Sequence, residues 1–132
     1  MSTRVYVPGD AAAISVGADE VAAAFAAQGF EVVRTGSRGM LWAEPLVELD
    51  SADGRVGFAG VTSAAAAQAA STDWASLESM SIGLVDQHPW MAAQRRVTTA
   101  RLGVVDPASI ADYEAHGGWA GLRRALQIGP AA

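Results

Sequence analysis

A β–α–β pattern at the start of the chain limits the possible folds more than any other feature of its 132 residues. Residues 4–7 are mostly β-branched or aromatic and are followed by Pro8-Gly9-Asp10, which predicts a short strand. Residues 17–28 carry apolar side chains at helical spacing, and residues 30–34 predict a second strand. So short a connection favours two parallel strands with a right-handed crossover, which places the chain in the α/β class.

The next segments predict an antiparallel hairpin followed by another helix. Residues 46–49 and 55–61 have strand composition, and the Asp53-Gly54 pair between them is a strong signal for a tight turn. Thr62 or Ser63 is then placed to cap an alanine-rich helix over residues 64–70. The order β-α-β-loop-β-β-α predicts a mixed four-stranded sheet within residues 1–70.

Residues 71–132 predict a helical segment instead. Residues 71–83 are ambiguous and suggest a loose helical turn, and we expect helices over 90–102, from Asp106-Pro107 to Gly117-Gly118, and over 119–126. In the last helix, Trp119, Leu122 and Leu126 share one side, whereas Arg123 and Arg124 lie on the other. We therefore divide the chain into domains at 1–70 and 71–132.

Charge and hydropathy exclude several classes of partner. The formal net charge is −5, and all nine basic residues are Arg, so no basic field exists to bind nucleic acid or an anionic membrane. No run approaches the roughly 20 apolar residues of a membrane span, and the first residues lack the apolar stretch of a signal peptide. We expect a cytoplasmic protein.

The chain has no cysteine, which excludes disulfides, thiolate nucleophiles and cysteine-ligated zinc or iron–sulfur clusters. His88 and His116 are too few for an all-histidine metal site, and their positions beside helix ends indicate capping or surface roles. We therefore expect no catalytic, cofactor-binding or metal-ligating residue within residues 1–132.

Carboxylate pairs and glycine pairs also favour structural roles. Asp19-Glu20, Glu44 with Glu48, and Asp112 with Glu114 are better explained as solvated faces than as acid–base pairs. The glycines at 36–39 and 117–118 precede no lysine and form no dinucleotide fingerprint, so neither predicts a phosphate-binding loop.

Trp42 follows a polar, glycine-containing loop and has two interpretations. It is either a core aromatic at the edge of the sheet or a docking residue on an exposed loop. Arg38 in the same loop fits the docking interpretation, because arginine and aromatic residues are enriched at protein interfaces.

The element order of residues 1–70 resembles the thioredoxin-like ferredoxin domain of the 24 kDa type of NADH dehydrogenase subunit. In that family two cysteine pairs hold a 2Fe–2S cluster. Matching the glycine and proline positions places the first pair at Pro8 and Ala13 and the second pair at Ser37 and Leu41. The resemblance therefore implies a domain that keeps the fold and has lost the cluster.

The second half resembles the segment that leads into the flavin domain of 51 kDa-type subunits. The resemblance lies in His88-Pro89-Trp90, in Asp106-Pro107, and in Tyr113 followed by Gly117-Gly118-Trp119 and Leu122. Together the halves are similar to the N-terminal region of the beta subunit of cytosolic, molybdenum-containing, NAD-dependent formate dehydrogenases. The resemblance implies FMN, NAD and a 4Fe–4S cluster for a full-length parent subunit, bound by residues outside 1–132.

Two functions remain open at this point. The first is the N-terminal part of that NAD-linked flavoprotein (diaphorase) subunit, where residues 1–132 serve as a structural or docking region. Its partners would be the downstream flavin domain, the 2Fe–2S gamma subunit and the molybdenum alpha subunit. The alternative is a stand-alone, cluster-free thioredoxin-like interaction module. The flavin subunit of a related hydrogenase or NADH dehydrogenase could contain the same segment as the second half of this chain.

Overall fold

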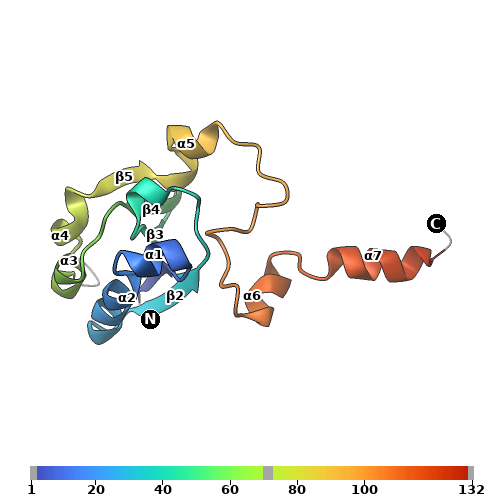
Figure 1. Ribbon diagram of the computed structural model, residues 1–132, viewed down its shortest axis with the longest axis horizontal. Helices are drawn as coiled ribbons and strands as arrows, with labels where there is room; N and C mark the ends of the chain where they lie inside the picture. Colours follow the sequence, from blue (N-terminus) through green and yellow to red (C-terminus); the bar gives the residue numbers. More distant parts are fainter. Residues whose placement is uncertain (1–2, 70–72, 131–132) are drawn as a thin grey trace.

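Five strands form one mixed sheet in the computed structural model, which describes residues 3–69 and 73–130 (Figure 1). The strand order is β2-β1-β3-β4-β5, in which β1 runs parallel to β2 and the other neighbouring strands pair antiparallel. The strands are β1 (Arg4–Pro8), β2 (Glu31–Thr35), β3 (Val47–Ser51), β4 (Gly54–Phe58) and β5 (Ser81–Leu84).

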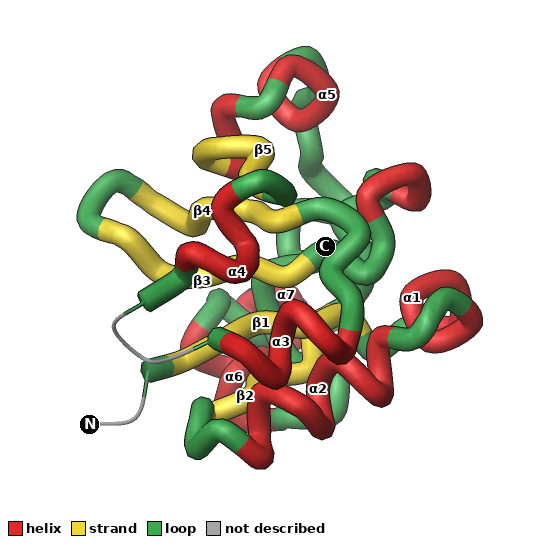
Figure 2. The backbone as a smooth tube through the Cα atoms, turned by 90° about the vertical axis from the view of Figure 1, so that its left-hand side faces the viewer, coloured by secondary structure: helices red, strands yellow, loops and turns green. Residues whose placement is uncertain are grey.

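Four helices cover one face of this sheet, and Figure 2 shows α2, α3 and α4 in front of the strands. They are α1 (Ala11–Ser15), α2 (Ala18–Ala27), α3 (Ser63–Gln68) and α4 (Ala75–Glu78). Side-chain caps start two of them, because Asp10 accepts from two amides of α1 and Thr62 accepts from the amide of Ala65 in α3. The remaining elements are η1 (Leu41–Ala43), η2 (Val85–Gln87), α5 (Pro89–Ala92), α6 (Ile110–Ala115) and α7 (Ala120–Ile128).

Alternation along β3 separates an apolar face of the sheet from a polar one. Val47 and Leu49 belong to the core beneath the helices, which is centred on the fully buried Phe25. Glu48 and Asp50 lie between them in the sequence and point to the opposite face. That second face is covered by the loop before β3 and by part of the C-terminal extension, which we define as residues 93–130; Gly103 and Val104 contact Arg55, and α6 faces β1 and β2 across a cavity.

A second apolar cluster joins the loop before β3 to the far edge of the sheet. It consists of five buried residues, with Ala59 and Ile82 packed against them. These five are Met40, Ala43, Leu46, Val85 and Met91. Because they come from three separate segments, the cluster fixes η1 and α5 against the end of β5.

The predicted strands β1 to β4 and the helices α2 and α3 are confirmed, but the prediction of four strands is wrong. A fifth strand, β5, pairs with β4 at the edge of the sheet. In its four residues Ile82 and Leu84 alternate with Ser81 and Gly83, and the strand pairs with the free edge of β4. Gly57 permits a close approach, because a Cβ there would lie 2.7 Å from Val85 and 3.0 Å from Ile82.

The predicted helix over residues 90–102 is also wrong, since α5 ends at Ala92. Val97, Thr98 and Thr99 are β-branched and weaken helix formation. In addition, the carbonyls of Thr99 and Leu102 accept hydrogen bonds from Arg96 at 2.7 and 2.8 Å. Nη2 of Arg96 thus bonds both carbonyls, and residues 99–102 form turns.

The extension contains two of the expected helices, at shifted positions. Asp106-Pro107 forms a turn, and Ser109 is the residue that caps α6. The glycine pair at 117–118 follows the end of α6 as predicted, and α7 begins after Trp119. The division at residue 70 stays a prediction, although β5 lies beyond it. Within residues 3–69 and 73–130, no helix has both the length and the hydropathy that crossing a bilayer requires.

We predict that Gly57→Ala lowers the free energy of unfolding by about 1–3 kcal/mol, because the added methyl overpacks the contact between β4 and β5. Urea denaturation followed by circular dichroism measures the change. Gly121→Ala is the matched control, because a Cβ at Gly121 meets no atom within 4 Å. An equal loss in both variants would contradict the packing argument.

Candidate functional site

A buried ion pair between Arg38 and Glu48 lies at the centre of the polar face. Nε and Nη2 of Arg38 donate to the two carboxylate oxygens of Glu48 at 2.8 and 2.7 Å, and both residues are at most 6% exposed. Burial acts to lower the pKa of Arg38, but the hydrogen bonds and charge of Glu48, with a contribution from Asp86, raise it overall. The guanidinium therefore stays charged, and its geometry is the bidentate arrangement that binds a carboxylate best.

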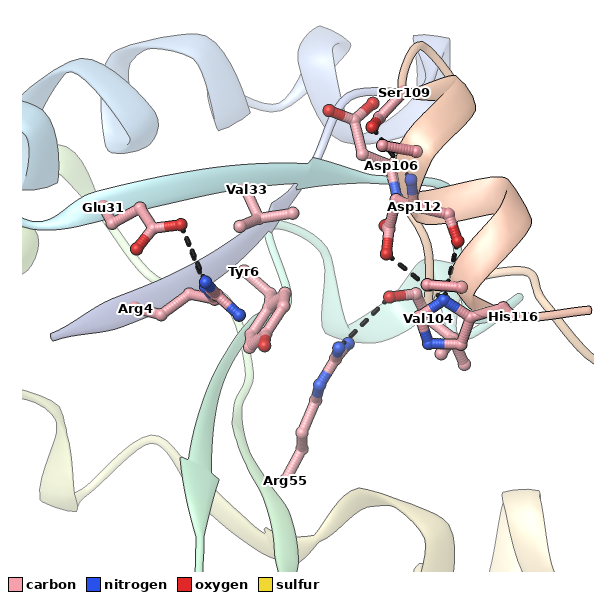
Figure 3. Close-up of a pocket in the computed structure, with 12 residues that line it drawn as sticks. Arg4, Tyr6, Glu31, Val33, Arg55, Val104, Asp106, Ser109, Asp112 and His116 are labelled. Atoms are coloured by element: carbon pink, nitrogen blue, oxygen red, sulfur yellow. Dashed lines mark hydrogen bonds and ion pairs between the residues drawn. The ribbon is translucent and has the colours of Figure 1, made fainter.

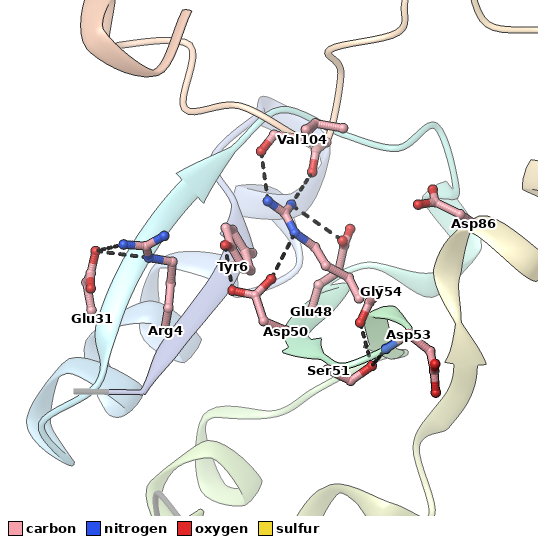
Figure 4. Close-up of polar contacts among 12 residues, drawn as sticks. Arg4, Tyr6, Glu31, Glu48, Asp50, Ser51, Asp53, Gly54, Asp86 and Val104 are labelled. Carbon is pink, nitrogen blue, oxygen red and sulfur yellow. Dashed lines mark hydrogen bonds and ion pairs between the residues drawn. The ribbon is translucent and has the colours of Figure 1, made fainter. Parts of the chain in front are cut away.

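Arg55 extends this pair into a network. Its Nη1 lies 3.7 Å from Glu48, its Nε lies 3.6 Å from Asp50, and its guanidinium lies 3.4 Å from the centre of the Tyr6 ring. The Tyr6 hydroxyl donates to Asp50 at 2.9 Å, so strands β1, β3 and β4 are cross-linked on this face (Figure 4). Two arginines thus share the charge of Glu48.

The same two arginines hold the C-terminal extension against the sheet. Arg55 donates to the carbonyls of Gly103 and Val104, each at 3.1 Å. Gly103 has a positive φ of 76°, and a Cβ there would lie 2.2 Å from Cδ of Arg38. Only glycine fits this position, because the backbone conformation and the close approach of Arg38 both exclude a side chain.

A polar cavity of about 560 Å³ separates the outer surface of β1 and β2 from α6 (Figure 3). Most of its charged groups contact an opposite charge within the described residues, but Asp106 forms no ion pair there and accepts from the Ala108 amide at 2.8 Å. Arg4 contacts Glu31 at 3.0 Å, and Nδ1 of His116 lies 3.2 Å from Asp112.

Polar side chains gather where β1 and β2 end. Pro8 pairs with Thr35 at this edge, so the segments that follow them start side by side. The Ser37 hydroxyl donates to Glu44 at 3.2 Å, and the amide of Leu46 donates to the other oxygen of Glu44 at 2.9 Å. Burial raises the pKa of Glu44, the Leu46 amide opposes that shift, and the nearby charge of Asp10 adds to it.

The residues at the four positions implied for cluster ligands do not fit a 2Fe–2S cluster. Pro8 is buried in β1, Ala13 is buried in α1, and Leu41 is 63% exposed, and none of these side chains carries a ligating atom. Ser37 has the only hydroxyl of the set, and it donates to Glu44. Among the residues that the structure describes, no group of three His, Asp or Glu side chains is placed to hold a metal ion.

An exposed apolar surface lies beside this edge. Trp42 is 58% exposed and Trp90 is 49% exposed, and both line a hollow of about 620 Å³ together with Pro89. The ring of His88 lies 5.5 Å from the Trp42 ring, while its Nδ1 accepts from the Trp90 amide at 3.2 Å. We name this the aromatic surface, and it consists of Leu41, Trp42, His88, Pro89 and Trp90.

The structure decides between the interpretations of Trp42 and corrects that of Arg38. Trp42 is exposed, so its interpretation as a core residue is wrong. Arg38 is buried against Glu48, so a docking role for its guanidinium is wrong as well. Arg38 and Trp42 lie in the same loop, but the bidentate hydrogen bond to Glu48 turns the Arg38 side chain inward.

Among the carboxylates, Asp19 and Glu20 are exposed as predicted, but Glu48 is buried and Glu44 is half-buried. The predicted capping role of His88 is confirmed. Sequence reasoning missed Trp90 as part of an exposed surface, because a tryptophan beside a helix start carries no signal of its burial. No model of a known protein family matches this chain, and no curated protein matches it significantly.

We predict that Arg38→Ala lowers the free energy of unfolding by about 3–5 kcal/mol, because it leaves the Glu48 charge buried with weaker compensation from Arg55. The double variant Arg38→Met, Glu48→Leu removes both charges and is expected to recover most of the loss. Chemical denaturation of both variants measures the difference. A double variant as unstable as Arg38→Ala would show that the pair itself stabilises the fold.

We also predict a pH-dependent difference between Glu44→Gln and the natural chain. Because the folded state raises the pKa of Glu44, this group stabilises the fold at low pH and loses that contribution as pH rises through its folded pKa. The two proteins are therefore expected to differ least near pH 4, with the glutamine variant gaining in relative stability towards pH 7. Denaturation midpoints across this range measure the trend, and a relative gain towards low pH would contradict it.

Proposed function

We propose that this chain is the N-terminal part of the NAD-linked flavoprotein (diaphorase) subunit of a cytosolic, molybdenum-containing formate dehydrogenase. Within that subunit, residues 1–132 serve as a docking region. The partners are the downstream flavin domain, the 2Fe–2S gamma subunit and the molybdenum alpha subunit. Electrons from formate reach NAD through FMN and a 4Fe–4S cluster bound by residues outside this stretch.

The arrangement of the first four strands supports the thioredoxin-like part of this proposal. A parallel pair, β1 and β2, is connected through α2, and a β3–β4 hairpin followed by α3 completes the order on which the resemblance rests. The fifth strand adds to the edge of that unit without interrupting it. We therefore propose a thioredoxin-like domain with an additional edge strand.

The loss of the cluster is supported by what replaces it. Ser37 and Glu44 bond each other near the edge where the thiols are implied, and Arg38 anchors the same loop to Glu48. Hydrogen bonds within the protein thus hold the loop in place of metal–thiolate bonds. A domain of this kind contributes shape to a complex and takes no part in electron transfer.

The observation that carries the proposal is the aromatic surface. Leu41, Trp42 and Trp90 are each about half exposed or more on a chain in which aromatic residues are only 7% of the total. Tryptophan is enriched among the residues that contribute most to binding between proteins, and clustered exposed apolar groups mark such interfaces. The aromatic surface is therefore suited to binding another domain or subunit.

The alternative is a stand-alone, cluster-free thioredoxin-like interaction module. The separate core beneath α1 to α4 supports it, because fifteen described residues between Val5 and Leu77 form one buried apolar cluster there. The coding sequence that follows codon 132 distinguishes the two. An in-frame, glycine-rich flavin-binding segment supports the subunit, and a stop codon with a stable, functional product supports the module.

We predict that Trp42→Ala weakens binding to the flavin-binding domain and gamma subunit of such a formate dehydrogenase about tenfold or more, as loss of a central interface tryptophan does. Calorimetric titration of the full chain against these partners measures the affinity. The melting temperature is expected to stay within a few degrees, because Trp42 is 58% exposed.

Ile110→Ala is the control, since Ile110 is 68% exposed and lies in α6, outside the aromatic surface. It should leave the affinity unchanged. Unaltered binding by Trp42→Ala, or equal losses in both variants, would remove the aromatic surface from the proposal.

A further inference from the structure

Helix α7 has no partner within the described part of the chain. All nine of its residues are exposed, and Figure 1 shows it extending away from the sheet at the end opposite α4. Leu122 and Leu126 lie one turn apart and are 52% and 75% exposed. A helix this short is marginal in water without a surface to pack against, so its apolar side calls for a partner.

The polar side of α7 indicates the charge of that partner. At about 100° per residue, Arg123 lies next to the leucine side and Arg124 lies on the opposite side of the helix, and no carboxylate occurs in residues 115–130. The side chains of α7 therefore present apolar groups flanked only by positive charge. A fitting partner offers an apolar floor with carboxylates at its rim.

A hollow at the opposite end of the same chain has this character. It has a volume of about 340 Å³ and is lined by Phe58 and Trp74, with Asp73 and Glu78 at its edge. The floor is held in place because the Trp74 ring lies 5.2 Å from the ring of Phe30 in the core. No basic side chain within residues 3–69 and 73–130 forms an ion pair with either carboxylate. We name this the β4–α4 hollow.

We propose that α7 of one chain binds the β4–α4 hollow of a second copy. Leu122 and Leu126 pack on Phe58 and Trp74, while Arg123, next to the leucine side, faces Asp73 and Glu78. A chain does not fill its own hollow in this structure, because α4 and α7 lie at opposite ends of the molecule (Figure 1).

This contact joins two different surfaces, so it is head-to-tail and adds copies in open chains unless the rotation closes a ring. One helix of nine residues covers only a small area, and interfaces of that size are weak. Self-association therefore depends on concentration. The contact does not involve the aromatic surface and does not rest on the proposed function.

Sedimentation velocity of the full chain, from about 10 μM to about 1 mM, tests the proposal over the range in which weak interfaces associate. We expect the weight-average mass to rise with concentration above the 13.5 kDa of one chain and above that of a dimer, and to fall again at high salt.

Two charge-altered variants make the test specific. The variant Arg123→Glu, Arg124→Glu reverses the charge of α7. The variant Asp73→Asn, Glu78→Arg makes the rim of the β4–α4 hollow positive and keeps the side-chain oxygen at position 73 that accepts from the Ala75 amide. Each variant alone is expected to stay monomeric. An equimolar mixture is expected to associate, because each helix then meets a hollow of opposite charge.

The control Glu20→Arg, Glu114→Arg changes charge at two exposed residues outside both surfaces and should associate like the natural chain. Trp42→Ala should do so too, which separates this test from that of the proposed function. The proposal is overturned if the natural chain stays monomeric, if reversing the charge of α7 leaves association intact, or if the mixture of the two variants fails to associate. Binding of α7 to phosphatidylglycerol vesicles without self-association would overturn it as well.

Discussion

The bidentate contact between Arg38 and Glu48 is the interaction on which the polar half of the molecule depends. One guanidinium joins the loop after β2 to strand β3, reaches Asp86 at 3.2 Å, and packs against the backbone of Gly103. A buried pair of this kind contributes little net stability compared with well-packed apolar residues, but removing one partner is costly. Its effect here is to fix the position of the loop after β2 relative to β3.

The position of the loop that carries Arg38 matters because the two faces of the sheet are covered by different kinds of structure. The face under α1 to α4 is an ordinary apolar core, and its strands and helices follow from local sequence pattern. The other face holds charged side chains and is covered by segments with little regular structure. The carbonyls of Gly103 and Val104 are satisfied by Arg55 and not by a helix or sheet, so the path of the extension depends on that side chain.

Two separate surfaces remain exposed once this arrangement has formed. The aromatic surface includes η1, the 3₁₀ turn that the buried cluster of Met40, Ala43 and Leu46 holds in place. Helix α7 lies beyond α6, where the Tyr113 and Trp119 rings pack edge to face at 5.3 Å and set the direction in which it leaves.

Local pattern determined the α/β class, the parallel pair β1–β2, the hairpin at Asp53-Gly54 and the amphipathic character of α7, since each depends on periodicity or turn chemistry over a few residues. The tertiary structure alone decided the pairing of β5, the burial of Arg38 and the exposure of Trp42. Those outcomes depend on contacts between residues far apart in the chain. Glu48 shows the reason most clearly: alternation in β3 predicts that it leaves the apolar core, but only the folded chain brings an arginine ten residues earlier over it and turns a solvated carboxylate into a buried one.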